Sequence, residues 1–223
     1  MKKELVITKD GSNSFYIKEI DEHYHSINGS IAESEHIFIR SGLLEIGKKL
    51  NSINLLEVGM GTGLNVLKTA LALQKSELKV NYTALEAYPL SWEETSQLNY
   101  TELIQEENAK TYFQLIHQSE WNKSVEINEC LKLLKVNKKL EEMEFNSAFD
   151  LIYFDAFAPE KQAEMWTAEI FAKLYDSMTA GGILVTYCVK GVVRRTLQAV
   201  GFQLEKLPGP IGGKREILRA MKS

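Results

Sequence analysis

A glycine-rich turn between a strand and a helix constrains the fold of this chain more than any other segment. Residues 55–65 read Leu-Leu-Glu-Val-Gly-Met-Gly-Thr-Gly-Leu-Asn, which places Gly59, Gly61 and Gly63 directly after an apolar strand expected at 53–58. Glycine permits positive φ and close approach of the backbone to a ligand. The first N–H groups of the helix that follows are free to donate hydrogen bonds. The segment therefore predicts a loop for a nucleotide-like cofactor at the carboxyl end of a parallel strand.

The spacing of these glycines separates the cofactor classes. The NAD fingerprint Gly-x-Gly-x-x-Gly needs its third glycine where Leu64 stands, and no Lys-Ser/Thr pair of a phosphate-binding loop follows. The form Glu-x-Gly-x-Gly-x-Gly, which begins at Glu57, resembles motif I of class I S-adenosylmethionine (SAM) methyltransferases. SAM is therefore the expected cofactor, and a tight strand–helix turn without a ligand is the alternative.

Strand and helix patterns alternate along most of the chain. Strands are predicted at 53–58, 80–86, 131–136, 150–155, 182–188, 201–206 and 215–221, and helices at 64–75, 91–98, 167–177 and 191–200. This alternation predicts an α/β fold with a doubly wound, mostly parallel sheet. The last connection is too short for a crossover helix, so the final two strands are predicted as an antiparallel hairpin at the sheet edge. Such a sheet is the Rossmann-like fold of class I SAM-dependent methyltransferases.

We expect residues 1–223 to form a single methyltransferase domain. Alternation around Asp10-Gly11-Ser12 predicts a hairpin over 4–20, and 31–50 is predicted as a helix, so that 1–50 would form a lid. Residues 99–130 are interpreted as a small insertion with a helix and β structure. The charged run 135–144 predicts a solvated helix face.

Three carboxylates are placed to serve the cofactor crevice. Glu86 ends the second strand about 20 residues after the glycine loop, where an acidic residue can bind a ribose diol. Glu57 lies inside an apolar strand, where a carboxylate is costly unless hydrogen-bonded, so it either orders the loop, reaches the ligand or is purely structural. Asp155 ends the fourth strand, where it could hold an amine and accept its proton, or only cap the next turn.

Composition limits the compartment and the partners. The formal net charge of -4 and pI of about 5.7 do not favour nucleic-acid binding over the whole surface. Cys130 and Cys188 make no disulfide framework and are predicted as core residues of a reduced protein. No signal peptide and no apolar stretch of membrane-spanning length is found, so we expect a cytoplasmic protein without a membrane partner.

Two further clusters allow more than one interpretation. His23, His25, Glu33 and His36 could supply metal ligands, but their spacing matches no zinc signature, so no metal is expected and the segment is interpreted as a polar lid. Lys190, Arg194, Arg195, Lys214 and Arg215 are either solvated surface or a basic rim for RNA phosphates.

Several motifs together resemble one family. They are the runs 24–29 (Tyr-His-Ser-Ile-Asn-Gly), 33–36 (Glu-Ser-Glu-His), 61–65, 155–159 (Asp-Ala-Phe-Ala-Pro), 165–167 (Met-Trp-Thr), 193–195 (Val-Arg-Arg) and 213–216 (Gly-Lys-Arg-Glu). This set resembles the methyltransferases that complete 5-methylaminomethyl-2-thiouridine in tRNA, which in many bacteria form the N-terminal half of a bifunctional protein. The resemblance spans nearly the whole chain.

The resemblance implies SAM-dependent N-methylation of the 5-aminomethyl group on the wobble uridine of tRNA. Asp155 would face the amine, which must lose a proton before it can attack the methyl group. The residues predicted to bind the cofactor are Glu57, Gly59, Gly61, Gly63, Asn65 and Glu86. Those predicted to contact the substrate are Tyr24, His25, Phe157, Trp166, Arg194, Lys214 and Arg215. Phe157 and Trp166 could stack on the uracil ring, or belong to the core.

The sequence carries no flavin-dependent oxidase half before its last residue, Ser223. We therefore expect a stand-alone methyltransferase, with a separate oxidoreductase or upstream modification enzyme as a partner, that does not process the carboxymethylaminomethyl form. One alternative is a methyl- or aminopropyl-transferase acting on a small amine. Another is a non-catalytic SAM- or nucleotide-binding module.

Overall fold

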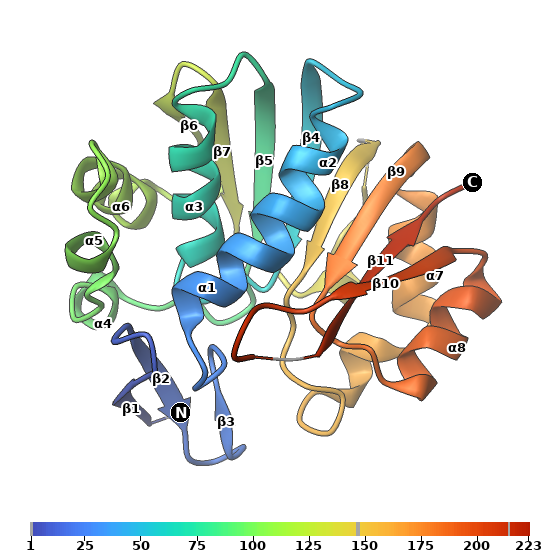
Figure 1. Ribbon diagram of the computed structural model, residues 1–223, viewed down its shortest axis with the longest axis horizontal. Helices are drawn as coiled ribbons and strands as arrows, with labels where there is room; N and C mark the ends of the chain where they lie inside the picture. Colours follow the sequence, from blue (N-terminus) through green and yellow to red (C-terminus); the bar gives the residue numbers. More distant parts are fainter. Residues whose placement is uncertain (1, 146–147, 214) are drawn as a thin grey trace.

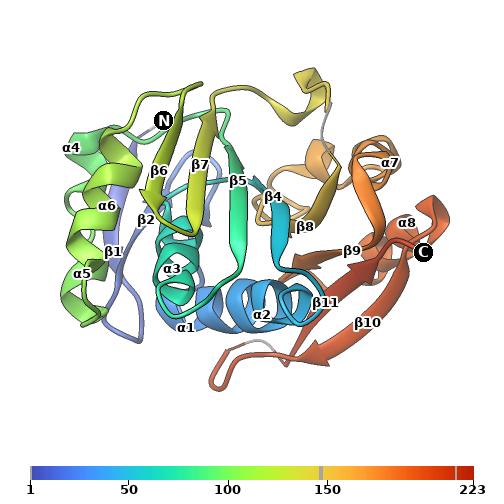
Figure 2. The same ribbon diagram turned by 90° about the horizontal axis from the view of Figure 1, so that it is seen from above.

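A mixed β-sheet with helices on both faces forms the body of the molecule (Figures 1 and 2). The computed structural model describes residues 2–145, 148–213 and 215–223. Within them, eight strands lie in the order β10-β11-β9-β8-β4-β5-β7-β6. Their bounds are β4 Ser52–Val58, β5 Lys79–Leu85, β6 Ser124–Asn128, β7 Leu131–Val136, β8 Phe149–Phe154, β9 Met178–Thr186, β10 Gln203–Pro208 and β11 Glu216–Met221.

The strand directions confirm the predicted fold class. Strand β4 pairs in parallel with β5 and β8, and the parallel pairing continues to β7 on one side and β9 on the other. Strands β10 and β11 form the predicted antiparallel hairpin, which adds to β9 through β11. The strand order reverses between β4 and β8, and open α/β sheets bind their ligands at such a switch point.

Both faces of β4 and β8 are buried, which explains their mostly apolar sequences. Successive residues of β4 alternate between two cores: Leu55 faces the core shared with α3 (Leu64–Leu73), and Leu56 faces the core shared with α7 (Ala168–Asp176) and α8 (Gly191–Val200). Figure 2 shows α3 on one side of the sheet and α7 on the other. The four predicted helices are all present, although the one at 91–98 is reduced to α4 (Trp92–Thr95).

The N-terminal segment forms the predicted hairpin and helix. Strands β1 (Lys3–Ile7), β2 (Asn13–Ile17) and β3 (Glu22–His23) make a small antiparallel sheet. It lies at the end of the molecule where the carboxyl ends of β4 and β5 are found (Figure 1). The helix that follows runs through α1 (Ser30–Ser34), a π-helix (Glu35–Leu43) and α2 (Leu44–Ile46). π-Helical hydrogen bonding is rare and is frequently found near functional sites.

Residues 99–130 contain α5 (Tyr100–Leu103), α6 (Ala109–Gln118) and β6, which extends the main sheet by pairing with β7.

The prediction of a solvated helix face at 135–144 was wrong. Lys135 belongs to β7 and is 1% exposed, because β6 and α6 cover this part of the sheet. Its Nζ donates to the carbonyl of His117 at 3.2 Å and lies 4.9 Å from the centre of the Trp121 ring, and burial lowers its pKa to about 8. Only a short 3-10 helix, Leu140–Glu142, follows in this run.

Both cysteines are free thiols, Cys188 buried in the core and Cys130 partly buried. Among the described residues, no helix has the length and apolar character needed to cross a membrane.

Candidate active site

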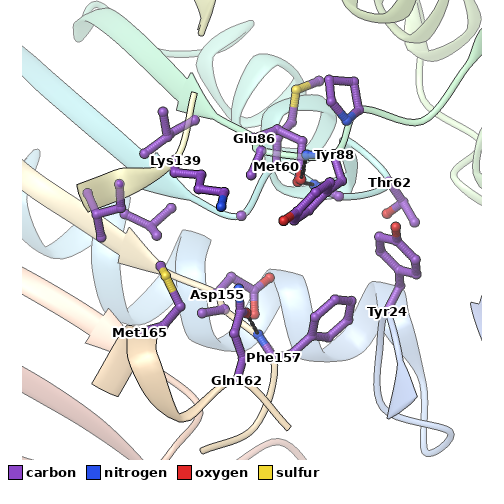
Figure 3. Close-up of a pocket in the computed structure, with 18 of the residues that line it drawn as sticks. Tyr24, Met60, Thr62, Glu86, Tyr88, Lys139, Asp155, Phe157, Gln162 and Met165 are labelled. Atoms are coloured by element: carbon purple, nitrogen blue, oxygen red, sulfur yellow. Dashed lines mark hydrogen bonds between the residues drawn. The ribbon is translucent and has the colours of Figure 1, made fainter. Parts of the chain in front are cut away.

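A cavity of about 550 Å³ opens at the carboxyl ends of β4, β5, β7 and β8. Glu86 and Met60 lie on one side of it, and Asp155, Phe157 and Met165 lie on the other (Figure 3). The cavity therefore lies at the switch point of the sheet, where the sequence places the glycine loop and two of the three predicted carboxylates.

Contacts with the rest of the chain explain part of the glycine pattern in the loop. Gly59 has φ of 87°, and a Cβ there would lie 2.7 Å from the carbonyl oxygen of Asp155. Gly63 has φ of 71° and stands at the N-cap of α3 without lining the cavity. Gly59 and Gly61 do line the cavity, so the absence of side chains opens the loop to a ligand at these two positions.

Glu86 lines the cavity and supports the loop at the same time. Its Oε2 accepts a hydrogen bond from the N–H of Gly61 at 2.9 Å, and its Oε1 accepts one from the N–H of Tyr88 at 2.8 Å. A carboxylate oxygen can accept two hydrogen bonds. The carboxylate is therefore fixed in place and still able to accept hydrogen bonds from a ribose diol.

Glu57 and Asn65 are buried behind the loop and do not line the cavity. The Glu57 carboxylate accepts hydrogen bonds from the hydroxyl of Tyr82 and the amide of Asn65, each at 2.9 Å. Burial raises the pKa of Glu57 well above its usual value. This arrangement suits the structural interpretation of Glu57, and direct contact of either residue with a cofactor stays a prediction.

Asp155 directly follows β8 and lines the cavity. Its N–H donates to the carbonyl of Val58 at 3.0 Å, which aligns the end of β8 with the glycine loop. Its Oδ2 accepts a hydrogen bond from the Asn65 amide at 2.9 Å. A carboxylate held in this way is placed to bind a cationic or hydrogen-bond-donating group inside the cavity.

Two of the predicted aromatic residues line the cavity and one does not. The rings of Tyr24 and Phe157 meet edge to face with centroids 5.3 Å apart, and both are cavity residues (Figure 3). Trp166 is 6% exposed, packs edge to face on Phe154 and donates its Nε1–H to the carbonyl of Phe157 at 2.8 Å. Trp166 is therefore a core residue that supports the loop bearing Phe157.

His25 lines the cavity next to Tyr24 and contacts the glycine loop. Its Nε2 lies 2.5 Å from Oγ1 of Thr62, which also accepts a hydrogen bond from the hydroxyl of Tyr100 at 3.1 Å. Burial lowers the pKa of His25 to about 4, so its ring is neutral at physiological pH. Thr62 itself was not predicted, although its place between two loop glycines was visible in the sequence.

None of the predicted basic residues that the structure describes lines the cavity. Arg194 on α8 and the exposed Arg215 are not among the lining residues, and Lys214 lies outside the described residues. The lysines that line the cavity are Lys3, Lys138 and Lys139. The sequence analysis missed the last two because it assigned them to a solvated helix, although they follow a strand whose end faces the same crevice.

The histidine cluster is dispersed in the structure. The His23 ring packs on Tyr16 with centroids 4.7 Å apart, and His36 Nε2 lies 2.7 Å from the carbonyl oxygen of Pro208. Within the part of the chain that the structure describes, no group of three His, Cys, Asp or Glu side chains is placed to hold a metal ion.

The sheet order, the glycine loop and the acidic residue at the end of β5 define a class I SAM-dependent methyltransferase. A family described as S-adenosyl-L-methionine-dependent methyltransferase (Methyltransf_30) matches residues 99–223. The chain belongs to this family, and SAM is its cofactor.

Similar proteins narrow the relationship. The tRNA 5-methylaminomethyl-2-thiouridine biosynthesis bifunctional protein MnmC of Leptospira interrogans is 32% identical over 213 residues, which are 90% of this chain and 32% of that protein. The protein of the same name from Cupriavidus metallidurans is 29% identical, over 96% of this chain and 33% of that protein. The chain thus spans about a third of the length of these curated relatives.

Solved structures agree with the sequence relatives. The crystal structure of MNMC2 from Aquifex aeolicus has a TM-score of 0.76 and 28% identity, and the match covers 99% of this chain and 70% of that one. Spermidine synthase from Thermotoga maritima, at 13% identity and a TM-score of 0.54, shares the fold alone. The family resemblance found in the sequence is confirmed.

Proposed function

We propose that this protein transfers the methyl group of SAM to the 5-aminomethyl group of the wobble uridine in tRNA, giving 5-methylaminomethyl-uridine. One observation carries the proposal: Asp155 lines the same cavity as the glycine loop, opposite Glu86 (Figure 3). The names of the relatives supply the substrate, and the site supplies groups that suit a reaction between SAM and an amine.

The residues on the Glu86 side fit SAM. Gly59 and Gly61 have no side chains to exclude a ligand, and the Glu86 oxygens can accept hydrogen bonds from two ribose hydroxyls. SAM supplies a sulfonium methyl group. The loop and Glu86 would hold it toward Asp155, because β4 and β8 are directly paired strands, about 4.8 Å apart in the sheet.

The residues on the Asp155 side fit an amine. An alkylammonium ion has no lone pair, so it must release a proton before its nitrogen could bond to the methyl carbon, while the bond from that carbon to sulfur would break and leave its electron pair on a neutral thioether. The Asp155 carboxylate would bind the ammonium ion, orient it and accept that proton. Tyr24 and Phe157 would contact the uracil ring, since RNA-binding proteins commonly stack unpaired bases on aromatic side chains. Lys138 and Lys139 would contact the phosphates beside it.

We infer that the protein acts in the cytoplasm, where bacterial tRNA is modified. The 5-aminomethyl group would be produced by a separate oxidoreductase or by an upstream modification enzyme. In the relatives, the word "bifunctional" marks a second activity in the same chain.

The test is transfer of labelled methyl from SAM to tRNA purified from cells that cannot complete the wobble modification, followed by nucleoside analysis. We expect label in 5-methylaminomethyl-uridine, and none when fully modified tRNA is the substrate. Label in a small amine without RNA would replace the tRNA assignment with a small-molecule transferase. SAM binding without transfer to either substrate would indicate a non-catalytic binding module.

A further inference from the structure

We propose that Asn65 is a positioning residue for methyl transfer, which ties the Asp155 carboxylate to the buried carboxylate of Glu57. The inference rests on the proposed function of Asp155 and gives it a support that the sequence does not show. Asn65 is 2% exposed and does not line the cavity, so it acts through Asp155 rather than on a ligand.

The Asn65 amide joins two acidic groups from neighbouring strands. Its Nδ2 donates one hydrogen bond to Glu57 Oε1 and one to Asp155 Oδ2, each at 2.9 Å. An amide nitrogen carries two hydrogens, so both of its donors are used. A serine at this position would have one donor and an aspartate would have none. Asparagine therefore suits a site where two carboxylates must be linked.

The orientation of this amide is fixed from its other side. The hydroxyl of Ser34, at the end of α1, donates to Asn65 Oδ1 at 2.6 Å. If the amide were flipped, its oxygen would face the Asp155 carboxylate, which accepts hydrogen bonds and cannot donate them when ionised. Ser34 and Asp155 thus select one orientation of the amide, and with it one position for Asp155 Oδ2.

Glu57 provides the fixed end of the bridge. Its other oxygen accepts the hydroxyl of Tyr82 at 2.9 Å, and the side chain is fully buried. Fully satisfied buried networks of this kind are rigid. The two hydrogen bonds from Asn65 therefore hold the Asp155 carboxylate, which lines the cavity, in a fixed position relative to β4.

The bridge has a second consequence for Asp155. A hydrogen bond donated to an ionised carboxylate favours its charged form and lowers its pKa. Loss of the Asn65 donor should therefore raise the pKa of Asp155 and also leave its carboxylate less well oriented. A residue with only a general structural role would not change this pKa.

The variant Asn65→Ala tests the proposal in the full chain. We expect kcat for tRNA methylation to fall by roughly ten- to a hundredfold, the size of effect that misplacement of a reacting group produces. The Kd for SAM should change by less than about threefold, since Asn65 does not line the cavity. The acid limb of the pH–rate profile should move to higher pH.

A direct titration makes the test independent of activity. The chain has five aspartates, Asp10, Asp21, Asp150, Asp155 and Asp176, so labelling the aspartate carboxyl carbons gives few signals in carbon-13 NMR. The signal of Asp155 is the one that disappears in Asp155→Ala. We expect the pKa of Asp155 to be higher in Asn65→Ala than in the wild type. Ser34→Ala, which only removes the contact to Asn65 Oδ1, should shift it in the same direction by less.

Thr69→Val is the matched control. Thr69 is buried on the same helix one turn further along, and its Oγ1 lies 3.4 Å from the Tyr153 hydroxyl. Its kcat and its Asp155 titration should match the wild type.

Two results would overturn the proposal: an Asp155 pKa that is unchanged in both folded Asn65→Ala and Ser34→Ala, or a kcat for Asn65→Ala within twofold of the wild type. A wild type that methylates no tRNA, with the Asp155 shift present, would reject the proposed function and leave the bridge established.

Discussion

Replacing Gly59 with alanine should damage both folding and cofactor binding. The glycine has φ of 87°, and the added Cβ would lie 2.7 Å from the backbone carbonyl oxygen of Asp155. The obstructing atom belongs to the backbone, so no side chain can rotate away to make room. The loop and the segment after β8 must move apart, and these two segments form opposite sides of the cavity.

The magnitude follows from two contributions. A non-glycine residue in the left-handed region costs about 1–2 kcal/mol. Overpacking a close contact adds about 1–3 kcal/mol. An alanine at Gly181 in β9 measures the backbone contribution alone, because the φ of Gly181 is 77° and nothing lies within 4 Å of a Cβ there. Gly181→Ala should therefore show only the first contribution, and Gly59→Ala should be less stable than it by about 1–3 kcal/mol.

Thermal unfolding and SAM titration measure the two effects. In a chain of this size 1 kcal/mol corresponds to about 2–4 °C in Tm. Gly59→Ala should therefore melt at least about 2 °C below Gly181→Ala. It should also bind SAM roughly tenfold more weakly, about 1.4 kcal/mol, whereas Gly181→Ala should bind SAM like the wild type. Equal Tm and equal SAM affinity in the two variants would refute the contact between Gly59 and Asp155 as the reason for glycine at this position.

Three further predictions concern ionisable side chains. Asp155→Ala should lower the methylation rate a hundredfold or more with nearly unchanged SAM binding by calorimetry, and similar turnover would remove Asp155 from the mechanism. Glu86→Ala should weaken SAM binding roughly tenfold or more, and an unchanged Kd would show that Glu86 does not hold the ribose. Burial lowers the pKa of His25 and His117 to about 4, against about 6.5 in the unfolded chain, so the unfolded chain binds more protons between these values. The free energy of unfolding should therefore fall as the pH is lowered from about 6.5 to about 4, and denaturant titrations of His117→Gln should show a shallower fall than the wild type.

The sequence by itself determined the elements and the edge of the sheet at which the site lies. The strands alternate with helices, and β4 and β8 are apolar over most of their length because both of their faces are covered. Parallel strands end at one edge, so Glu86 and Asp155 could be assigned to one crevice from their positions alone. The glycine spacing gave the cofactor class for the same local reason.

The tertiary structure decided which way the side chains point and what they contact. Trp166 packs into the core and Phe157 faces the cavity, although both follow the same strand. Asn65 was predicted to contact the cofactor, which stays a prediction, and only the tertiary structure shows that its amide bridges Glu57 and Asp155. Lys135 was predicted to be solvated, but the sheet and α6 bury it. Such outcomes depend on contacts between elements far apart in the sequence, and local periodicity carries no information about those contacts.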